Sequence, residues 1–266
     1  LHLQDAAAPL HHPQTSPRLP HRKIMTNRQI PQRAQRRIPT PHKMMRPILA
    51  ISKTKVRWLS ESRILNRWTT RTKAFAESLG VSAEFVEIDW DNKVMELDGR
   101  TIDCVWNGMT LTPEVTSAME CSDAYCNNAQ VIVVPVDKAD SFQDKDNIPE
   151  VSFAVEAGSA GEAQASALEL EHTPVATQAD ALMEVAAGTS DAAIIDSLMA
   201  AAMIGEGTGY ANLTYTVGLN SEEYGVGFRK GSDLAAALND FFAASTQDGS
   251  MLAVAERYGV QAALIK

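Results

Sequence analysis

The sequence predicts an α/β fold, and three observations support this class. From about residue 73 to the C-terminus, short strand patterns alternate with helical patterns. The run Ala129–Pro135 is apolar apart from Gln130, as expected of a strand buried on both faces of a sheet. A helix–Gly–strand pattern occurs twice, at 94–108 and at 182–196, an offset of 88 positions. This alternation predicts largely parallel sheets covered by helices.

The expected elements follow one another in a regular order. A helix that includes Lys73–Leu79 ends at Gly80, because glycine readily adopts the left-handed conformation of a helix C-cap. A polar linker is expected at Asp137–Pro149. Strands are expected at 83–89, 102–108, 129–135, 151–155, near 175, at 192–195, 213–218 and 224–229, and helices at 92–97, after 157–162, at 180–187, 233–245 and 250–258.

The two copies of the repeat match position by position, and not only in the order of their elements. In each copy a Met-Glu pair near a helix end leads through a glycine turn to an Asp and then to a buried strand. The strand is expected to end at Gly108 in the first copy and at Asp196 in the second. This indicates two similar lobes whose strand ends face one another across a cleft. Because every α/β protein repeats helix–Gly–strand, an ordinary recurrence is the alternative to a true duplication.

Charge divides the chain into two dissimilar parts. Residues 1–73 contain 16 of the 24 Lys and Arg but only 2 of the 33 acidic residues, for a net charge of +14; the remainder carries −23. All 15 glycines lie at or beyond Gly80. The acidic body argues against nucleic-acid binding, which needs clustered Lys and Arg. We expect no membrane span, because no window has the length of apolar sequence required, and Met44–Ile51 is too short for a signal peptide.

The residues available for chemistry favour binding over catalysis. Cys104 is expected to be an inert core thiol, and a local bridge between Cys121 and Cys126 stays open. No Cys or His spacing indicates a metal site, and His172 is the one histidine of the acidic body. We therefore expect no catalytic residue, no metal and no cofactor.

Three segments are candidates for a ligand site. The turn 155–162 follows a strand and opens a helix, so the amides of Ser159, Ala160 and Gly161 are expected to be free for an anion; an ordinary turn is the alternative. Asp196 at a buried strand end needs a partner, either a ligand ammonium or the amides of the following helix. In 106–110, Gly108 admits a ligand to the backbone and Thr110 offers a hydroxyl.

From Lys73 to Lys266 the chain resembles the extracytoplasmic solute-binding proteins of amino-acid ABC transporters, the polar amino-acid class. The resemblance rests on several stretches in this order: DCVWNGMTLTP at 103–113, CSDAY at 121–125 before the apolar strand, AGSAGE at 157–162, DAAIID at 191–196 and YGVGFRKG at 224–231.

The resemblance implies a two-lobed, type II periplasmic-binding-protein-like clamp, with two mixed sheets joined by two hinge strands near 129–135 and 214–219. It implies a first lobe at 73–130 and 219–266, and a second lobe at 135–214. It also implies that a monomeric chain, found in the periplasm or at the extracellular surface, captures an amino acid or a similar small polar solute in the cleft and delivers it to a membrane permease. By the same resemblance, Asp196 pairs with the ammonium group of the ligand. The ligand carboxylate is held by Ser159 together with the amides of Ala160 and Gly161. From the first lobe, the ligand is contacted by Gly108 and Thr110.

Two departures from the family pattern matter. Where the family often has an arginine for the ligand carboxylate, this chain has Val115. Residues 1–72 match nothing in the family, so we interpret them as a disordered or non-native basic segment, read in a different frame. The first lobe is then incomplete, and weakened ligand binding is expected. The alternatives are an enzyme on the same fold, similar to the cyclohexadienyl dehydratases, and a binding-defective product of a damaged gene.

Overall fold

The computed structural model describes residues 48–54 and 63–265, which belong to one compact unit of the chain, 45–266. This range contains strand β1 (Ile48–Thr54) and helix α1 (Arg63–Ser78). The expectation that residues 1–72 are disordered, and that the first lobe is incomplete for want of its leading strand, is therefore wrong at these two elements. Residues 1–47 and 55–62 lie outside the described part, and the interpretation that 1–72 is read in a different frame stays a prediction.

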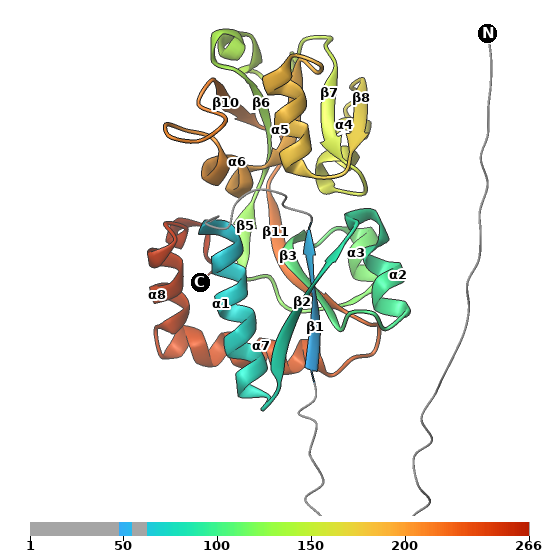
Figure 1. The fold of residues 1–266 in the computed structure, drawn as a ribbon, viewed down its shortest axis with the longest axis vertical. Helices are drawn as coiled ribbons and strands as arrows, with labels where there is room; N and C mark the ends of the chain where they lie inside the picture. Colours follow the sequence, from blue (N-terminus) through green and yellow to red (C-terminus); the bar gives the residue numbers. More distant parts are fainter. Residues whose placement is uncertain (1–47, 55–62, 266) are drawn as a thin grey trace, which may run out of the picture. The chain divides into compact units, whose positions relative to one another are not determined.

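The first lobe is built on a six-stranded sheet. Its strand order is β2-β1-β3-β11-β4, with β5 also paired to β11, so β1 takes an interior position (Figure 1). The pairs β1–β2 and β1–β3 are parallel, whereas β11 pairs antiparallel with β3, β4 and β5. The strand bounds are Ser82–Ile88 (β2), Cys104–Thr110 (β3), Glu120–Cys121 (β4), Cys126–Asn128 (β5) and Glu222–Phe228 (β11).

The second lobe is built on a five-stranded sheet of order β10-β6-β9-β7-β8. Here β7 is parallel to β8 and β9, and β6 is antiparallel to β9 and β10. Both sheets are mixed, which confirms the architecture implied by the family resemblance and corrects the largely parallel sheets expected from alternation alone. The strand bounds are Gln130–Pro135 (β6), Phe153–Glu156 (β7), His172–Val175 (β8), Ala192–Asp196 (β9) and Leu213–Gly218 (β10).

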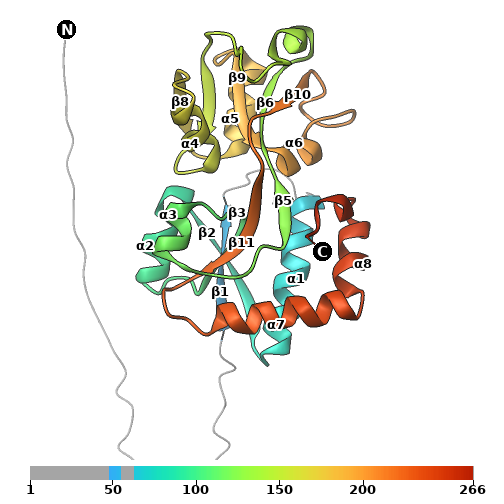
Figure 2. The ribbon, with the colours of Figure 1, turned by 180° about the vertical axis from the view of Figure 1, so that it is seen from behind.

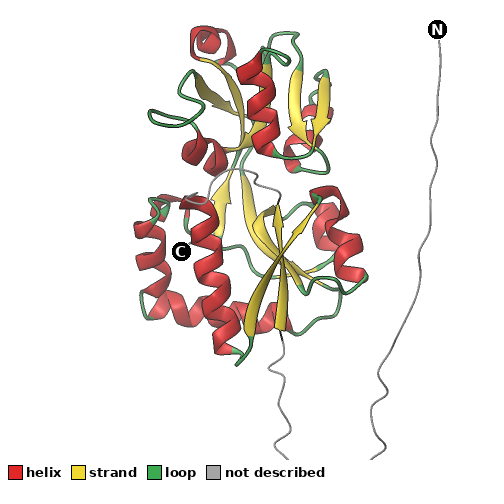
Figure 3. Cartoon of the chain, in the orientation of Figure 1, coloured by secondary structure: helices red, strands yellow, loops and turns green. Residues whose placement is uncertain are grey.

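Helices cover both sheets, as Figure 3 shows by colour. The first lobe carries α1, α2 (Lys93–Asp98), α3 (Pro113–Ala118), α7 (Leu234–Gln247) and α8 (Ser250–Arg257). The second carries α4 (Ala160–Ala167), α5 (Gln178–Ala187) and α6 (Ser197–Met203). Short 3₁₀ segments are η1 (Trp90–Asn92), η2 (Val136–Phe142) and η3 (Gln261–Ala263). None of the helices in the described ranges is long and apolar enough to span a membrane.

Strand β6 shows why both sheet faces are buried. Val131 and Val133 pack into one apolar cluster, and Ile132 and Val134 pack into another. Side chains of a strand alternate between the two faces, so a continuous apolar run fills a core on each side. The prediction for 129–135 is confirmed.

Two segments connect the lobes, and both are short. Asn128 ends β5 in the first sheet and Gln130 begins β6 in the second, so only Ala129 separates them. Residues 219–221 separate β10 from β11 in the same way (Figure 2). The segments are tied together, because the Leu219 amide donates to the Gln130 carbonyl at 2.8 Å and the Gln130 amide donates to Asn220 Oδ1 at 2.7 Å.

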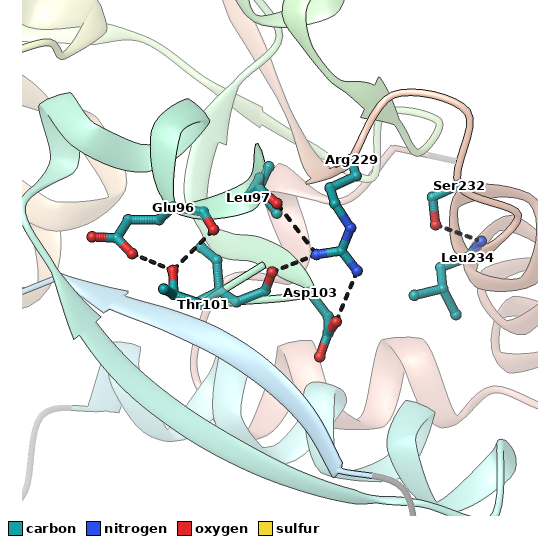
Figure 4. A network of polar contacts seen from close by, with 8 residues as sticks. Glu96, Leu97, Thr101, Asp103, Arg229, Ser232 and Leu234 are labelled. Carbon is teal, nitrogen blue, oxygen red and sulfur yellow. Dashed lines mark hydrogen bonds and ion pairs between the residues drawn. The ribbon is translucent and has the colours of Figure 1, made fainter. Parts of the chain in front are cut away.

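The repeat predicted from the sequence is also a repeat of structure. In the first copy, Thr101 Oγ1 donates to the Glu96 carbonyl at 2.9 Å and also contacts the Glu96 carboxylate (Figure 4). In the second copy, Thr189 makes both contacts with Glu184, the first at 3.0 Å. Each pair is offset by the same 88 positions.

The turn and the following Asp match as well. The left-handed residues are Arg100, with φ of 60°, and Gly188, with φ of 74°, which are equivalent in the repeat. Asp103 forms an ion pair with Arg229 at 2.9 Å, as Figure 4 shows, and Asp191 forms one with Lys138 at 3.3 Å.

None of the three cysteines, all of which lie in the described part of the chain, forms a disulfide. Cys104 is fully buried in the first core, and burial raises its pKa far above the ordinary value, as expected of an inert thiol. Cys121 and Cys126 lie opposite Gly227 and Tyr224 of β11, so the strand pairing places them at different levels of the sheet. The local bridge left open by the sequence is not formed.

Candidate functional site

A cavity of about 480 Å³ lies between the two lobes. The first lobe contributes residues of η1, α2, β3 and α3, and the second contributes residues of β7, α4, α5, β9 and α6. Five of the six candidate residues line its wall: Gly108, Thr110, Ser159, Ala160 and Asp196. Gly161 lies behind the wall in the first turn of α4, where an added Cβ would meet the Ile194 carbonyl at 2.8 Å. The volume suits a small molecule.

Asp196 ends β9 with its carboxylate in the cavity wall, and the residue is 8% exposed. Its side chain does not cap helix α6, so the structural alternative considered for this residue is not realised. Three side-chain amides hold it instead: Asn128 and Gln130 donate to Oδ1 at 2.8 and 2.7 Å, and Gln178 donates to Oδ2 at 2.5 Å. These donors are neutral, so they orient the carboxylate without cancelling its charge.

The same amides reach a second carboxylate. Asn128 Nδ2 and Gln130 Nε2 also donate to Glu222 Oε1, at 2.6 and 2.7 Å. Glu222 begins β11 in the first lobe, whereas Asp196 ends β9 in the second. The two carboxylates and the two amides therefore form one polar cluster at the connection between the lobes, which we call the hinge cluster.

Burial changes the protonation of this region. Desolvation raises the pKa of Asp196 to about 6, with the charge of Glu222 adding to it, although the Gln178 hydrogen bond opposes the shift. Glu156, at the end of β7, is 4% exposed and also lines the cavity. Desolvation, followed by the charge of Asp196, raises its pKa to about 8. A cation in the cavity would favour the charged form of both groups.

Several hydrogen-bonding groups of the turn before α4 already have partners within the protein. Ser159 is the N-cap, and its Oγ accepts from the Glu162 amide at 3.1 Å. The Glu162 carboxylate accepts from the amide of Gly158, the residue before the N-cap, at 2.7 Å. The Ser159 amide donates to the Glu156 carbonyl at 3.2 Å, so the expectation that this amide is free is wrong. The amides of Ala160 and Gly161, in the first helical turn, have no acceptor inside the helix.

Gly108 and Thr110 lie on an irregular part of β3. The pairing with β11 shifts between Gly225 and Gly227, and Gly108 has φ of 58° within this irregularity. The strand continues to Thr110, so the predicted strand end at Gly108 is two residues early. Thr110 Oγ1 donates to Glu222 Oε1 at 2.8 Å, which leaves its lone pairs for a ligand donor.

Sequence reasoning missed several residues of the wall. Lys93, Trp90, Glu156 and Gln178 all line the cavity beside Val115. Trp90 and Lys93 lie just after β2, and Glu156 ends β7; strand ends are where open α/β sheets bind ligands, which was the available signal. Among the described residues, no group of three metal-ligating side chains occurs.

The two sheets, their two connections and the cavity between them define a two-lobed binding protein of the type II periplasmic class. Residues 71–261 match the family model of the bacterial extracellular solute-binding proteins, family 3. The match spans more than half of the chain, and the chain belongs to this family.

The L-cystine-binding protein TcyJ of Escherichia coli (strain K12) is 26% identical to this chain over 187 residues, which cover 69% of this chain and 70% of TcyJ. Among solved structures, an ancestral arginine-binding protein bound to arginine is similar, with 25% identity, a TM-score of 0.69, and coverage of 80% of this chain and 99% of that one.

The ancestral amino acid-binding protein AncCDT-1, a precursor of cyclohexadienyl dehydratase, has 26% identity and a TM-score of 0.68, covering 79% of this chain and 95% of that one. The predicted clamp and the predicted role as the substrate-binding component of an ABC transporter are thereby confirmed, and the enzyme alternative is the weaker one.

Proposed function

We propose that this chain binds a single amino acid in the cavity between its lobes and delivers it to the membrane permease of an ABC transporter. The observation that carries the proposal is Asp196, a buried carboxylate oriented by three neutral amides in the cavity wall. An α-ammonium group supplies the cation that such a carboxylate lacks, and the pairing is strong because the site is desolvated.

The other expected contacts follow from the same wall. The carboxylate of the amino acid is assigned to the N-terminus of α4, where Ser159 retains a hydroxyl hydrogen and Ala160 an amide. Gly108 and Thr110 contact the ligand from the first lobe through backbone and hydroxyl oxygen. Closure by rotation about the two short connections then encloses the ligand and gives the permease a distinct shape to bind.

A thermal-shift screen of the full chain against the twenty L-amino acids tests this function. A ligand at about 100 times its Kd adds about 2.7 kcal/mol to the free energy of unfolding, which raises the Tm measurably. Calorimetry then gives the Kd of each amino acid that shifts the Tm. The proposal fails if no amino acid shifts the Tm and calorimetry detects no binding.

The same screen addresses the damaged-gene alternative, which predicts no binding by this chain. A version carrying residues 1–72 from the alternative reading frame is the matched comparison. Binding by that version alone supports a defect in the chain as written.

Glu156 is the observation that favours the second candidate, an enzyme. A carboxyl group that keeps its proton to a pH of about 8 beside a ligand cavity has the property of a general acid. We nevertheless propose binding without turnover. Incubation with a prephenate-like acid, followed by product detection, tests this; turnover that is lost in Glu156→Gln would establish the enzyme instead.

A further inference from the structure

The cavity lacks the arginine expected for a ligand carboxylate. Val115, which stands at that position, is apolar and 8% exposed in α3. Of the described residues that line the cavity, Lys93 is the single Lys or Arg, whereas the acidic lining residues are Glu114, Glu156, Glu162 and Asp196. Lys93 is therefore the one described residue of this wall that can offer a positive charge to an anionic group of the ligand.

Lys93 is a buried ammonium with an incomplete set of partners. It is 8% exposed, and its Nζ donates to the carbonyls of Trp90 at 3.2 Å and Gly158 at 2.9 Å. An ammonium has three donors, so one hydrogen remains. Within the described part of the chain Lys93 forms no ion pair, because Asp103–Arg229 and Asp191–Lys138 are the pairs found there. Nζ also lies over the Trp90 ring, 5.0 Å from its centroid. Buried lysines are normally paired with a carboxylate, whereas this ammonium lines the cavity with no carboxylate of the described residues at contact distance.

The Lys93 ammonium lies against the turn of the second lobe that precedes α4. Its acceptor, Gly158, directly precedes the N-cap Ser159. The approach of the two lobes is close here, since a Cβ on Gly158 would lie 2.7 Å from Asp91 Oδ1 and 2.8 Å from Asp91 Cα. The ammonium and the positive end of α4 thus act on one small region of the cavity.

The acidic residues near Lys93 help it to keep its positive charge in the cavity wall. Desolvation lowers the pKa of Lys93, and the charges of Asp91, Glu156 and Glu162 oppose this shift. A carboxylate in direct contact with Nζ would complete its third hydrogen bond and stabilise its charge.

We propose that Lys93 binds the α-carboxylate of the ligand, in the role that an arginine at position 115 would otherwise have. The inference rests on the proposed function and narrows it to free α-amino acids, with Asp196 selecting the ammonium and Lys93 the carboxylate.

The test compares each acid with its own amide. Calorimetry on the full chain measures the Kd of L-arginine, L-histidine and L-glutamine, each beside its α-carboxamide. We expect the native chain to prefer an acid over its carboxamide by about 10- to 100-fold, the range for a hydrogen bond to a charged group. In Lys93→Met this ratio should fall by about tenfold or more, because the acid loses affinity and the carboxamide does not; any remaining preference comes from the N-terminus of α4.

Three variants sharpen the test. Lys93→Arg should retain the preference, and Lys93→Met combined with Val115→Arg should restore it. Lys138→Met, which removes an exposed lysine outside the cavity, should leave it unchanged. The assignment is overturned if Lys93→Met keeps the ratio, or if it weakens acid and carboxamide equally, as a contact that only joins the lobes would do. Failure of the native chain to bind any of the six probes or any other amino acid instead contradicts the proposed function itself.

Discussion

The two copies of the helix–turn–strand repeat share a backbone but differ at the residue where the strand meets the cavity. In the first copy this residue is Gly108, with φ of 58° in an irregular strand. In the second it is Asp196, with φ of −61° at the end of a regular strand. One framework therefore presents open backbone from one lobe and a negative charge from the other. The difference shows that a repeated fold can divide the recognition of a zwitterion between its halves.

Removing the negative charge of Asp196, at the strand end of the second copy, should have the largest effect on ligand affinity. Asp196→Asn keeps the size of the side chain, but a ligand ammonium would then be buried without a carboxylate. We expect the affinity for the bound amino acid to fall by about 100-fold in calorimetry. Asp191→Asn, in the same repeat but outside the cavity lining, is the control and should bind as the native chain does. A loss smaller than about tenfold for Asp196→Asn would contradict the assignment.

Protonating the Asp196 carboxylate by lowering the pH should have a smaller effect on ligand affinity. The pKa of Asp196 is raised to about 6 in the empty protein, so protons compete with the ligand ammonium below that pH. Because only the ionised form pairs with the cation, we expect the affinity to fall by about tenfold between pH 7 and pH 5. Calorimetry at both pH values measures this. Asp196→Asn should lose this dependence, and equal affinities of the native chain at the two pH values would contradict the prediction.

The glycine of the first copy is the next point to alter. Gly108→Ala forces a side chain into the left-handed region, which costs about 1–2 kcal/mol, and its Cβ would lie 3.4 Å from the Tyr224 ring at the cavity. We expect both a lower Tm and weaker binding. Gly80→Ala has the same backbone penalty, with φ of 72° and nothing near its Cβ. It should lower only the Tm; weaker binding in Gly80→Ala as well would show that the Gly108 effect is not local.

Exchanging the turn residues should give the smallest effects, with opposite signs. Arg100→Gly relieves a left-handed non-glycine residue, whereas Gly188→Ala creates one at the equivalent position. We expect the first to raise the free energy of unfolding by less than about 1 kcal/mol and the second to lower it by about 1 kcal/mol. Denaturant unfolding measures both. Changes of the same sign would mean that the two turns are not equivalent.

The parts of the fold that the sequence predicted are those with a strong local pattern. The apolar run of β6 and the turn at Gly80 are examples, because each follows from neighbouring residues alone. Strand β1 was missed because it lies within a basic, proline-rich segment. Helix α3 was missed because Val115 is its one buried residue, so no apolar period appears in its sequence, whereas α6 entered only as a helix for Asp196 to cap.

The candidate site divides in the same way. Asp196 and the turn at Ser159 stand at strand and helix ends, which a sequence pattern locates. Lys93 was missed because its meaning depends on Gly158, which is 65 positions away in the chain. The occupied Ser159 amide was missed because its acceptor is set by the turn geometry rather than by residue type.

The hinge cluster has a consequence for how the lobes move. Asn128 and Gln130 belong to different sheets, yet each shares its amide group between Asp196 and Glu222. Two of these four hydrogen bonds cross between the lobes, Asn128 to Asp196 and Gln130 to Glu222, so rotation at Ala129 that separates the lobes stretches both of them. The strength of the first depends on the charge of the Asp196 carboxylate, which a bound ammonium partly neutralises. The stiffness of the joint therefore depends in part on the same carboxylate that pairs with the ligand.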